Sequence, residues 1–351
     1  MAATLADVAR LSATSRSTAS RALNNDSRIS PSTVERVRLV AEALGYRPNL
    51  AARSLSTGRS GILGLVLPTG QLTGDPYGSQ VVSAVTAAAM HADHAVMLWL
   101  SHERPGPAVE HVLNSGLVDG LVVSIVAQDD PWVSGLLESG LPCVTIGRHS
   151  ARPDLSYATV DNVGGTRELM THLLAQGYSR IAAIRGPVGN ADADERFGAY
   201  VQALGGLRSL DGNLVVRGAY DFDGGYAACQ AVLRHRPDCV LAANDHAALG
   251  AMQAIRDAGL RVPDDVAVSG WDDMSALRPQ AHGLTTVAHD VEAVGQEAVS
   301  ILGELLAGDP GPIQRVLPAR LVVRASTCRG ASAPSEVRRD AAASAGGAMT
   351  G

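Results

Sequence analysis

The sequence contains no lysine and few aromatic or sulfur side chains. Its 351 residues include two phenylalanines, three tryptophans and four cysteines, and all 29 basic side chains are arginines. The cysteines are far apart and lack the short spacings of zinc or iron–sulfur ligands. We therefore expect reduced thiols and neither a metal nor another cofactor. They are Cys143, Cys229, Cys239 and Cys328.

Long apolar runs are also missing. No stretch approaches the roughly 20 apolar residues that a membrane-spanning helix needs. Residues 1–7 have neither the basic nor the apolar segment of a secretory signal. These absences predict a cytoplasmic protein.

Signatures of common enzymes are absent as well. The chain has no nucleophile elbow, no phosphate-binding loop and no metal-spaced histidines. The glycine pairs at 164–165 and 224–225 lack the spacing of a dinucleotide-binding fingerprint. We therefore predict that the protein is not an enzyme.

The net charge of −6 is unevenly distributed. Residues 1–60 contain nine arginines and four acidic side chains, a net charge of +5, so the rest of the chain carries −11. A basic head on an acidic body is expected where the head meets the phosphates of a nucleic acid. In so short a segment, charge alone does not distinguish this interpretation from a chance fluctuation.

The basic head reads as three short helices. Thr4 and Asp7 form a capping box for a first helix that ends near Leu11, and Ser15 is a good N-cap for a second helix over 16–23. Ser30 precedes a proline that opens a third helix. Two short helices across a tight turn, closed by a third, are typical of a helix-turn-helix domain. The helix pattern alone leaves a small bundle with a solvated basic face as an equal alternative.

In a helix-turn-helix domain the second helix enters the major groove with its N-terminus first. Arg16 and Ser17 would then face base edges, because they lie on its first exposed turn, and an arginine fork can bind a guanine through two hydrogen bonds. Thr18, Ser20 and Arg21 are better placed for phosphates, with a further base contact open to Arg21.

The basic head and the residues after it, up to position 55, resemble the lactose/galactose repressor (LacI-type) family of bacterial regulators. The matching segments are 4–9, 15–18, 20–24, 29–33, 36–37, 44–49 and 52–55. The resemblance implies that residues 49–57 form a hinge helix that orders when two subunits meet over DNA, with Leu55 as a minor-groove wedge that bends the duplex. Linker packing of Leu55 and a merely solvated Arg53 are the alternatives. The expected DNA contacts are Ser15, Arg16, Ser17, Thr18, Ser20, Arg21, Asn24, Arg53 and Leu55.

The head also departs from the family pattern. Ala13 stands where the family often has glycine, and Thr14 and Ala19 stand where it usually has valine. Loss of two buried valines would cost roughly 1–3 kcal/mol in such a small domain.

From residue 61 onward, apolar runs alternate with amphipathic stretches, which predicts parallel, doubly wound sheets in two lobes. The expected strands are 62–67, 95–100, 120–124, 142–146, 158–160, 181–185, 213–217, 239–242, 266–269 and 284–287. The expected helices are 79–91, 163–176, 223–235, 245–258 and 290–307. The fold class is therefore α/β, with an all-α helix-turn-helix domain before a sensor that the resemblance likens to periplasmic binding proteins.

The predicted domains follow from these elements and from the resemblance. They are a DNA-binding domain at 1–48, a hinge at 49–60, a two-lobed effector-binding domain at 61–327 and a disordered tail at 328–351. The N-lobe comprises 61–161 and 289–327, and the C-lobe comprises 162–288.

Ligands of such sheets bind at the carboxyl ends of the strands, and polar clusters at those places match the family's sensor region. Arg196 and Asp272 supply a donor fork and a two-oxygen acceptor for vicinal hydroxyls. The expected effector contacts are Tyr77, Arg148, Arg196, Phe222, Asn244, Asp245 and Asp272. Each has a structural alternative, such as a helix cap for Asp245 or Asp272 and an interlobe ion pair for Arg148.

The sequence thus predicts a homodimeric transcription repressor that binds a palindromic operator on double-stranded DNA. A small polar effector between the lobes, expected to be a sugar, would control its affinity for DNA. A regulator that responds to a nucleobase or nucleoside is the alternative of the same type. A solute-binding receptor without a DNA function is the alternative of another class.

Overall fold

The computed structural model describes residues 3–24, 26–46, 58–68, 76–101, 116–124, 139–149, 152–206, 210–274, 277 and 283–329. The chain forms two compact units, Met1–Gly61 and Ile62–Gly351, and each is described by itself. The predicted hinge helix at 49–57, with Arg53 and Leu55, lies outside the described residues, as does nearly all of the predicted disordered tail.

The first unit is a three-helix bundle whose helices begin where their caps predict. They are α1 (Leu5–Leu11), α2 (Arg16–Leu23) and α3 (Pro31–Ala43). The Thr4–Asp7 capping box is present, and Ser15 and Ser30 accept backbone N–H groups as N-caps. The small core is made of the fully buried or nearly buried side chains Val8, Ala9, Ala19, Ala22, Val37 and Ala41.

The turn between α1 and α2 corrects one expectation. Thr14 was expected at a buried position, but it is only half-buried, and its hydroxyl lies 3.0 Å from that of Ser12. The Ser12 hydroxyl is the buried one, and it donates to the Val8 carbonyl at 2.7 Å. The polar side chain at 14 is therefore paired, and the expected penalty falls on Ala19 alone.

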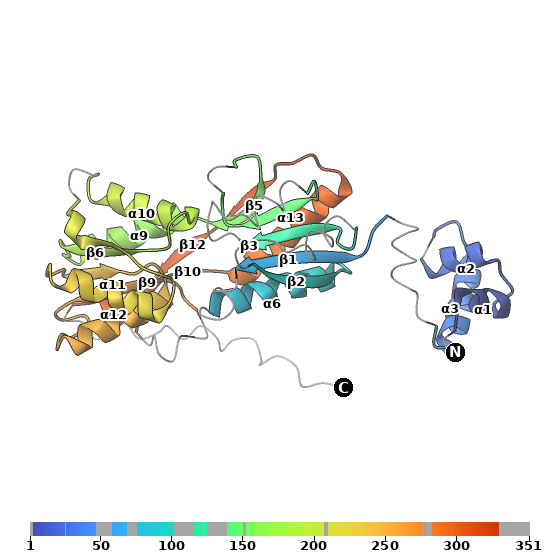
Figure 1. Cartoon of the computed structure of the whole chain (residues 1–351), viewed down its shortest axis with the longest axis horizontal. Coiled ribbons are helices and arrows are strands. Elements are labelled where there is room, and N and C mark those ends of the chain that lie inside the picture. Colours follow the sequence, from blue (N-terminus) through green and yellow to red (C-terminus); the bar gives the residue numbers. More distant parts are fainter. Residues whose placement is uncertain are drawn as a thin grey trace, which may run out of the picture. The chain divides into compact units, whose positions relative to one another are not determined.

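The second unit contains two six-stranded sheets, of which the first forms the N-lobe (Figure 1). Its strands are all parallel and lie in the order β11-β5-β4-β3-β1-β2. They are β1 (Ile62–Pro68), β2 (Ala95–Ser101), β3 (Gly120–Ser124), β4 (Cys143–Ile146), β5 (Ser156–Val160) and β11 (Gln314–Leu317). Helices α6 (Pro76–His91) and α13 (Val291–Ala307) pack against each other and cover one face with a shared apolar core.

The second sheet forms the C-lobe, in the order β12-β10-β9-β8-β6-β7. Its strands are β6 (Ile181–Arg185), β7 (Val215–Arg217), β8 (Cys239–Leu241), β9 (Ala267–Asp272), β10 (Thr285–His289) and β12 (Ala319–Val322). Only β12 runs antiparallel, against β10. Short 3₁₀ helices, Gly212–Leu214 and Ala325–Thr327, flank this sheet.

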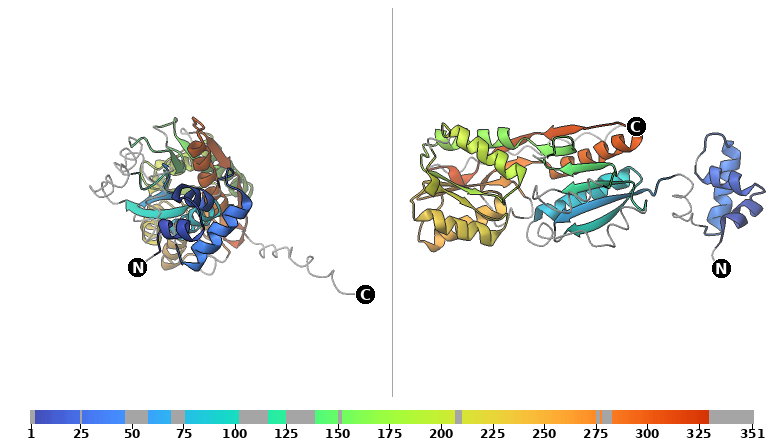
Figure 2. Two further views of the ribbon diagram at one scale, coloured as in Figure 1. Left: turned by 90° about the vertical axis from the view of Figure 1, so that its right-hand side faces the viewer. Right: turned by 45° about the horizontal axis from the view of Figure 1, so that its top comes forward.

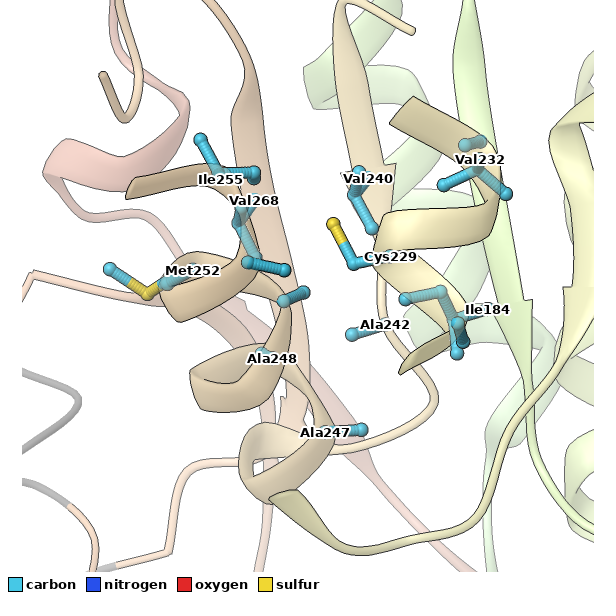
Figure 3. Close-up of a cluster of buried hydrophobic side chains, with 14 of the residues drawn as sticks. Ile184, Cys229, Val232, Val240, Ala242, Ala247, Ala248, Met252, Ile255 and Val268 are labelled. Atoms are coloured by element: carbon cyan, nitrogen blue, oxygen red, sulfur yellow. The ribbon is translucent and has the colours of Figure 1, made fainter. Parts of the chain in front are cut away.

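Side chains that alternate along the strands of the C-lobe supply two cores. Helices α11 (Phe222–Leu233) and α12 (Asp245–Asp257) pack on one face, where Cys229 of α11 lies among the aliphatic side chains of β8 and α12 (Figure 3). Helices α9 (Asn162–Ala175) and α10 (Ala191–Ala203) cover the other face. The C-lobe is thus a three-layer α/β/α sandwich, as Figure 2 also shows.

The chain passes between the two sheets three times, after β5, after β10 and between β11 and β12. The last passage corrects the predicted lobe boundary. Residues 319–327 were assigned to the N-lobe, but β12 pairs with β10, and Thr327 packs against His172 and Tyr178 of the C-lobe. The segment crosses back to pair with β10, so that β12 and not β10 is the edge strand of the C-lobe sheet.

All ten expected strands are present, and the five expected helices end within a few residues of the prediction. Helix α10 is a further finding, because the expected helices did not include residues 191–203. Asn190 is the N-cap of α10, and Asp192 and Asp194 occupy its first turn. None of the helices in the described ranges is long and apolar enough to cross a membrane.

Candidate functional site

The first candidate site is the exposed face of α2 in the first unit. Ser15 caps α2 by accepting the Thr18 N–H at 3.0 Å, and its hydroxyl lies 2.9 Å from that of Ser17. Arg16, Ser17, Arg21 and Asn24 are exposed, and Thr18 and Ser20 are half-buried. The cap therefore fixes the first turn of α2 with its polar side chains turned outward.

The charges of this unit are distributed in a way that favours an anionic partner. Arg10 and Arg28 are held by Asp7 and Asp26, with N–O distances of 3.6 and 2.6 Å. Within the described part of the unit, no carboxylate lies within ion-pair distance of Arg16 or Arg21. Their guanidinium groups are therefore available to phosphates or guanine edges.

The second candidate site lies in the two-lobed unit, and Arg196 is its most firmly placed side chain. Arg196 projects from α10, where Nε donates to Asn162 Oδ1 at 2.8 Å and Nη1 to the Ala243 carbonyl at 3.1 Å. Its guanidinium stacks on the Trp271 ring at 4.1 Å. Two hydrogen bonds and one stacking contact fix the plane of the Arg196 guanidinium. A donor group held in this way is pre-organised to bind the hydroxyls of a ligand.

Asn244 and Asp245 follow β8 at the N-terminus of α12. Asn244 is the cap, and its Nδ2 also donates to the Tyr220 carbonyl at 3.0 Å. Asp245 is 2% exposed, and both its carboxylate oxygens accept internal donors, from the Thr286 hydroxyl and the Met274 N–H. Burial, followed by the nearby negative charge of Asp272, raises the pKa of Asp245 to about 7. Asp245 therefore belongs to the wall behind the site.

Asp272 ends β9 in register with Ala288 of β10, so His289 is adjacent to it. The His289 Nε2 lies 3.1 Å from Asp272 Oδ1, and the Tyr77 ring meets the imidazole edge-on at a centroid distance of 6.1 Å. Asp272 and His289 line a groove of about 680 Å³ together with α6 side chains such as Gln80 and Ser83. The groove thus places the Asp272 carboxyl between the lobes.

Arg148 has the ion-pair role that the sequence left as an alternative. It follows β4 in the N-lobe, and its Nη1 lies 2.7 Å from Glu195 Oε1 on α10 of the C-lobe. Asn162, at the first passage between lobes, donates to both Asp192 and Glu195, at 2.9 and 3.1 Å. A polar network therefore connects the two lobes beside Arg196.

Phe222 begins α11 and is 36% exposed, with its ring 6.5 Å from that of His246. Behind it, the Tyr220 hydroxyl donates to Asn190 at 3.1 Å. The structure thus connects Arg196 and Asn244 to the end of β8, and Tyr77 to Asp272 through His289. Among the described residues, the ring contact of Phe222 is with His246 and not with either group.

Sequence reasoning missed His289 as a member of this region, and it did not assign Asn162 or Glu195 to the effector site. The signal for His289 was the strand periodicity, because a polar residue at the end of a strand beside β9 must reach the same sheet edge as Asp272. The polar segment 190–196 was a signal for Glu195, and the crossover that follows β5 was a signal for Asn162. Among the described residues, no group of histidine, cysteine and acidic side chains has the arrangement to hold a metal ion.

Comparisons with known proteins cover both units. Residues 4–49 match the bacterial regulatory proteins of the lacI family, and residues 170–327 match the periplasmic binding protein-like domain. The HTH-type transcriptional regulator CelR of Thermobifida fusca is 35% identical over 339 residues, covering 92% of this chain and 98% of the relative. AglR of Rhizobium meliloti is 32% identical over 338 residues, covering 93% and 95%.

Solved structures agree with these relatives. A complex of the regulator CelR with cellobiose superimposes with a TM-score of 0.70 at 32% identity, covering 92% of this chain and 99% of the other. A lac repressor dimer bound to operator and the anti-inducer ONPF superimposes with a TM-score of 0.79 at 28% identity, covering 93% and 99%. The fold class predicted from the sequence is confirmed, and so is the resemblance on which the site residues were chosen.

Proposed function

Because the chain belongs to the lacI family of bacterial regulatory proteins, we propose that it is a repressor whose operator affinity is set by a sugar bound between its lobes. It is a DNA-binding transcriptional regulator, and its relatives are regulators rather than enzymes. The proposal adds a homodimer, a palindromic operator, a cytoplasmic location and the sign of the response.

One observation carries the DNA-binding part of the proposal. Arg16 and Arg21 are exposed on the capped helix α2, and no carboxylate of the described residues forms an ion pair with them. Arg16 reads a base in each half-site, and Ser15, Thr18, Ser20 and Asn24 contact the backbone around it. Arg53 and the Leu55 wedge complete the interface from the hinge.

The effector part of the proposal is supported by the fixed guanidinium of Arg196 and the groove-lining carboxyl of Asp272. A planar donor fork and a carboxylate acceptor suit the adjacent hydroxyls of a sugar ring, and aromatic faces such as Tyr77 and Phe222 suit its apolar side. The complex of the relative CelR with cellobiose favours a sugar over a nucleobase.

A thermal-shift screen of the full chain tests the effector class. The panel contains cellobiose, maltose and lactose, with adenine, hypoxanthine and guanosine for the alternative class. A specific ligand raises the melting temperature by mass action, with about 2.7 kcal/mol of stabilisation at one hundred times Kd. We expect a sugar to raise the melting temperature. If only nucleobases or the nucleoside raise it, the effector belongs to the alternative class and is not a sugar.

Fluorescence anisotropy tests the DNA-binding part. It measures binding of the full chain, at physiological salt, to palindromic duplexes taken from the DNA upstream of the gene that encodes it. We expect specific binding that Arg16→Ala relaxes at one base pair per half-site, by about 1–3 kcal/mol of discrimination. Leu55→Ala should weaken specific binding far more than binding to random duplex, whereas equal losses would contradict the wedge. Failure to bind any palindrome, with or without a sugar, would favour a receptor without a DNA function.

A further inference from the structure

His289 sits where the chain leaves the C-lobe. It is the last residue of β10, and Asp290, which follows it, caps α13 of the N-lobe. Its side chain is 2% exposed. A buried imidazole at a passage between lobes, beside a carboxylate that lines the groove, calls for a role beyond packing, because apolar side chains fill a core without a desolvation penalty.

The geometry around His289 defines its hydrogen-bonding state. A carboxylate only accepts hydrogen bonds, so Nε2 donates to Asp272 Oδ1 at 3.1 Å. The other nitrogen, Nδ1, is buried and has no hydrogen-bond partner among the described residues. A proton on Nδ1 would therefore lack an acceptor, so the arrangement places the hydrogen-bonding proton on Nε2.

Asp272 is held in an unusual backbone conformation. Its φ is +108° and that of Asp273 is +51°, both in the region that side chains other than glycine rarely adopt. Asp273 is anchored by Arg324 with an N–O distance of 2.8 Å. Such strain persists only where surrounding contacts fix it, and it concentrates at ligand-binding positions.

Only one oxygen of the Asp272 carboxylate accepts a hydrogen bond from the described residues. Oδ1 accepts from His289, whereas Oδ2 makes no hydrogen bond with the described residues. Asp245 lies behind it as a second acidic group, so the His289 N–H is the nearby donor that holds the negative charge of Asp272 in place. Asp272 is only 7% exposed and is among the residues that line the groove, so the oxygen without a hydrogen bond belongs to a nearly buried side chain at the groove wall.

We propose that His289 is the positioning residue of the effector site: its Nε2–H locks the Asp272 carboxylate so that Oδ2 alone receives a hydroxyl of the bound sugar. The inference rests on the proposed function. Tyr77, packed edge-on against the imidazole, completes the burial of the ring from the N-lobe side. Without the lock, the carboxylate rotates and the acceptor is no longer pre-organised.

Three variants of the full chain test the lock with cellobiose as the probe, by calorimetric titration. His289→Leu keeps the bulk and removes the donor, and we expect its affinity to fall about tenfold or more, as for loss of a hydrogen bond to a charged group. His289→Gln restores an amide donor and should stay within about threefold of the original chain. His172→Leu is the matched control, since it removes a half-buried imidazole bonded to Thr327 elsewhere in the C-lobe.

The pattern across the three variants decides the outcome. Equal losses in His289→Leu and His289→Gln would show that ring shape matters rather than the donor, and would overturn the proposal. An unchanged affinity in His289→Leu would overturn it as well. A lower melting temperature with unchanged affinity in His172→Leu shows that instability alone does not mimic the effect.

A second measurement needs no effector. Nitrogen-15 NMR of the histidine rings should show His289 with its proton on Nε2, and Asp272→Asn should shift that resonance while leaving His172 in place. A proton on Nδ1, or no response to Asp272→Asn, would overturn the lock. If the chain does not bind cellobiose, the proposed sugar is called into question, whereas this measurement still decides the role of His289.

Discussion

Two residues of the first unit have left-handed backbone conformations next to helix ends, and only one of them is glycine. Ala13, in the turn between α1 and α2, has a φ of +51°, and Gly45, after α3, has a φ of +61°. The Cβ of alanine is unfavourable there, by roughly 1–2 kcal/mol. Glycine has no Cβ and avoids this penalty in the folded state. It also increases the conformational entropy of the unfolded chain, which offsets part of the gain in stability.

Ala13→Gly should therefore stabilise the DNA-binding unit, by about 0.5 kcal/mol after both effects. Hydrogen exchange of the α1–α3 peptides in the full chain, followed by mass spectrometry, measures this stability. Gly45→Ala is the matched control of opposite sign, because an added Cβ meets no atom within 4 Å and only the backbone effect remains. Faster exchange in Ala13→Gly would contradict the strain assigned to Ala13.

Asp245 gives the C-lobe a pH dependence. Its pKa is about 7 in the folded chain and 3.8 in the reference state, because burial and then the charge of Asp272 disfavour the carboxylate. The folded chain binds the proton more tightly, so the free energy of unfolding falls as the pH rises from about 4 to about 7, by at most about 1.4 kcal/mol for each pH unit. Above that window the contribution is constant.

Asp245→Asn should remove this dependence. The amide can donate to the Thr286 hydroxyl and accept from the Met274 N–H, so both partners of Asp245 stay bonded. Melting curves at about pH 5 and about pH 8, on either side of the folded pKa, should show the variant gaining stability relative to the original chain at the higher pH. A difference that is the same at both pH values would rule out ionisation of Asp245 as the cause.

At the scale of elements, α11 and α12 approach so closely that only glycine fits at their contact. A Cβ at Gly225 would overlap the Ala247 carbonyl, and one at Gly250 would overlap the Phe222 carbonyl. The close approach holds the start of α11, and with it Phe222, against α12.

Gly250→Ala should destabilise the C-lobe by about 1–3 kcal/mol, since backbone and not a flexible side chain must move. Gly303→Ala in α13 is the control, because its Cβ meets no atom within 4 Å and the substitution should gain up to about 1 kcal/mol of helix propensity. Urea denaturation of both variants measures the two effects. Similar stability in the two variants would contradict the close approach.

Caps and periodicity predicted most elements, because those signals are local. Thr4, Ser15 and Ser30 mark the three helices of the first unit, and apolar runs mark the strands. Helix α10 was missed because its first turn is acidic and resembles a polar loop. The β12 segment was misassigned because all of α13 and β11 lie between it and its partner β10, and pairing across such a distance leaves no local pattern.

For the effector site too, the sequence predicted some residues and not the contacts between distant parts of the chain. The resemblance placed Arg196 and Asp272 near strand ends. Asp272 does end β9, whereas Arg196 lies within α10 and reaches the end of β8 through its bond to the Ala243 carbonyl. The ion pair of Arg148 with Glu195 joins residues 47 positions apart on different lobes, so only a packed structure brings them together.

At the scale of the molecule, this ion pair is a connection between lobes. Arg148 and Glu195 are 38% and 22% exposed, and Asn162 binds Glu195 from the first passage. A partly exposed pair of this kind contributes about 0.2–1 kcal/mol. That shifts an equilibrium between open and closed lobes by a factor of about 1.4 to 5.

Arg148→Met should loosen the lobes. We expect faster hydrogen exchange in peptides that cover the three passages, and a double-mutant cycle with Glu195→Gln should recover a coupling of about 0.2–1 kcal/mol. Arg261 and Asp265, an exposed pair within the C-lobe, supply the control cycle. Exchange at the passages that is unchanged in Arg148→Met would show that the pair does not join the lobes in solution.

The third passage between the sheets sets the kind of movement that is open to the molecule. Pro318 alone separates β11 of one lobe from β12 of the other. A tether one residue long, with a ring that fixes φ, has no slack to extend. Around this point the lobes can pivot more readily than they can slide or part, so rotation is the movement that this passage favours.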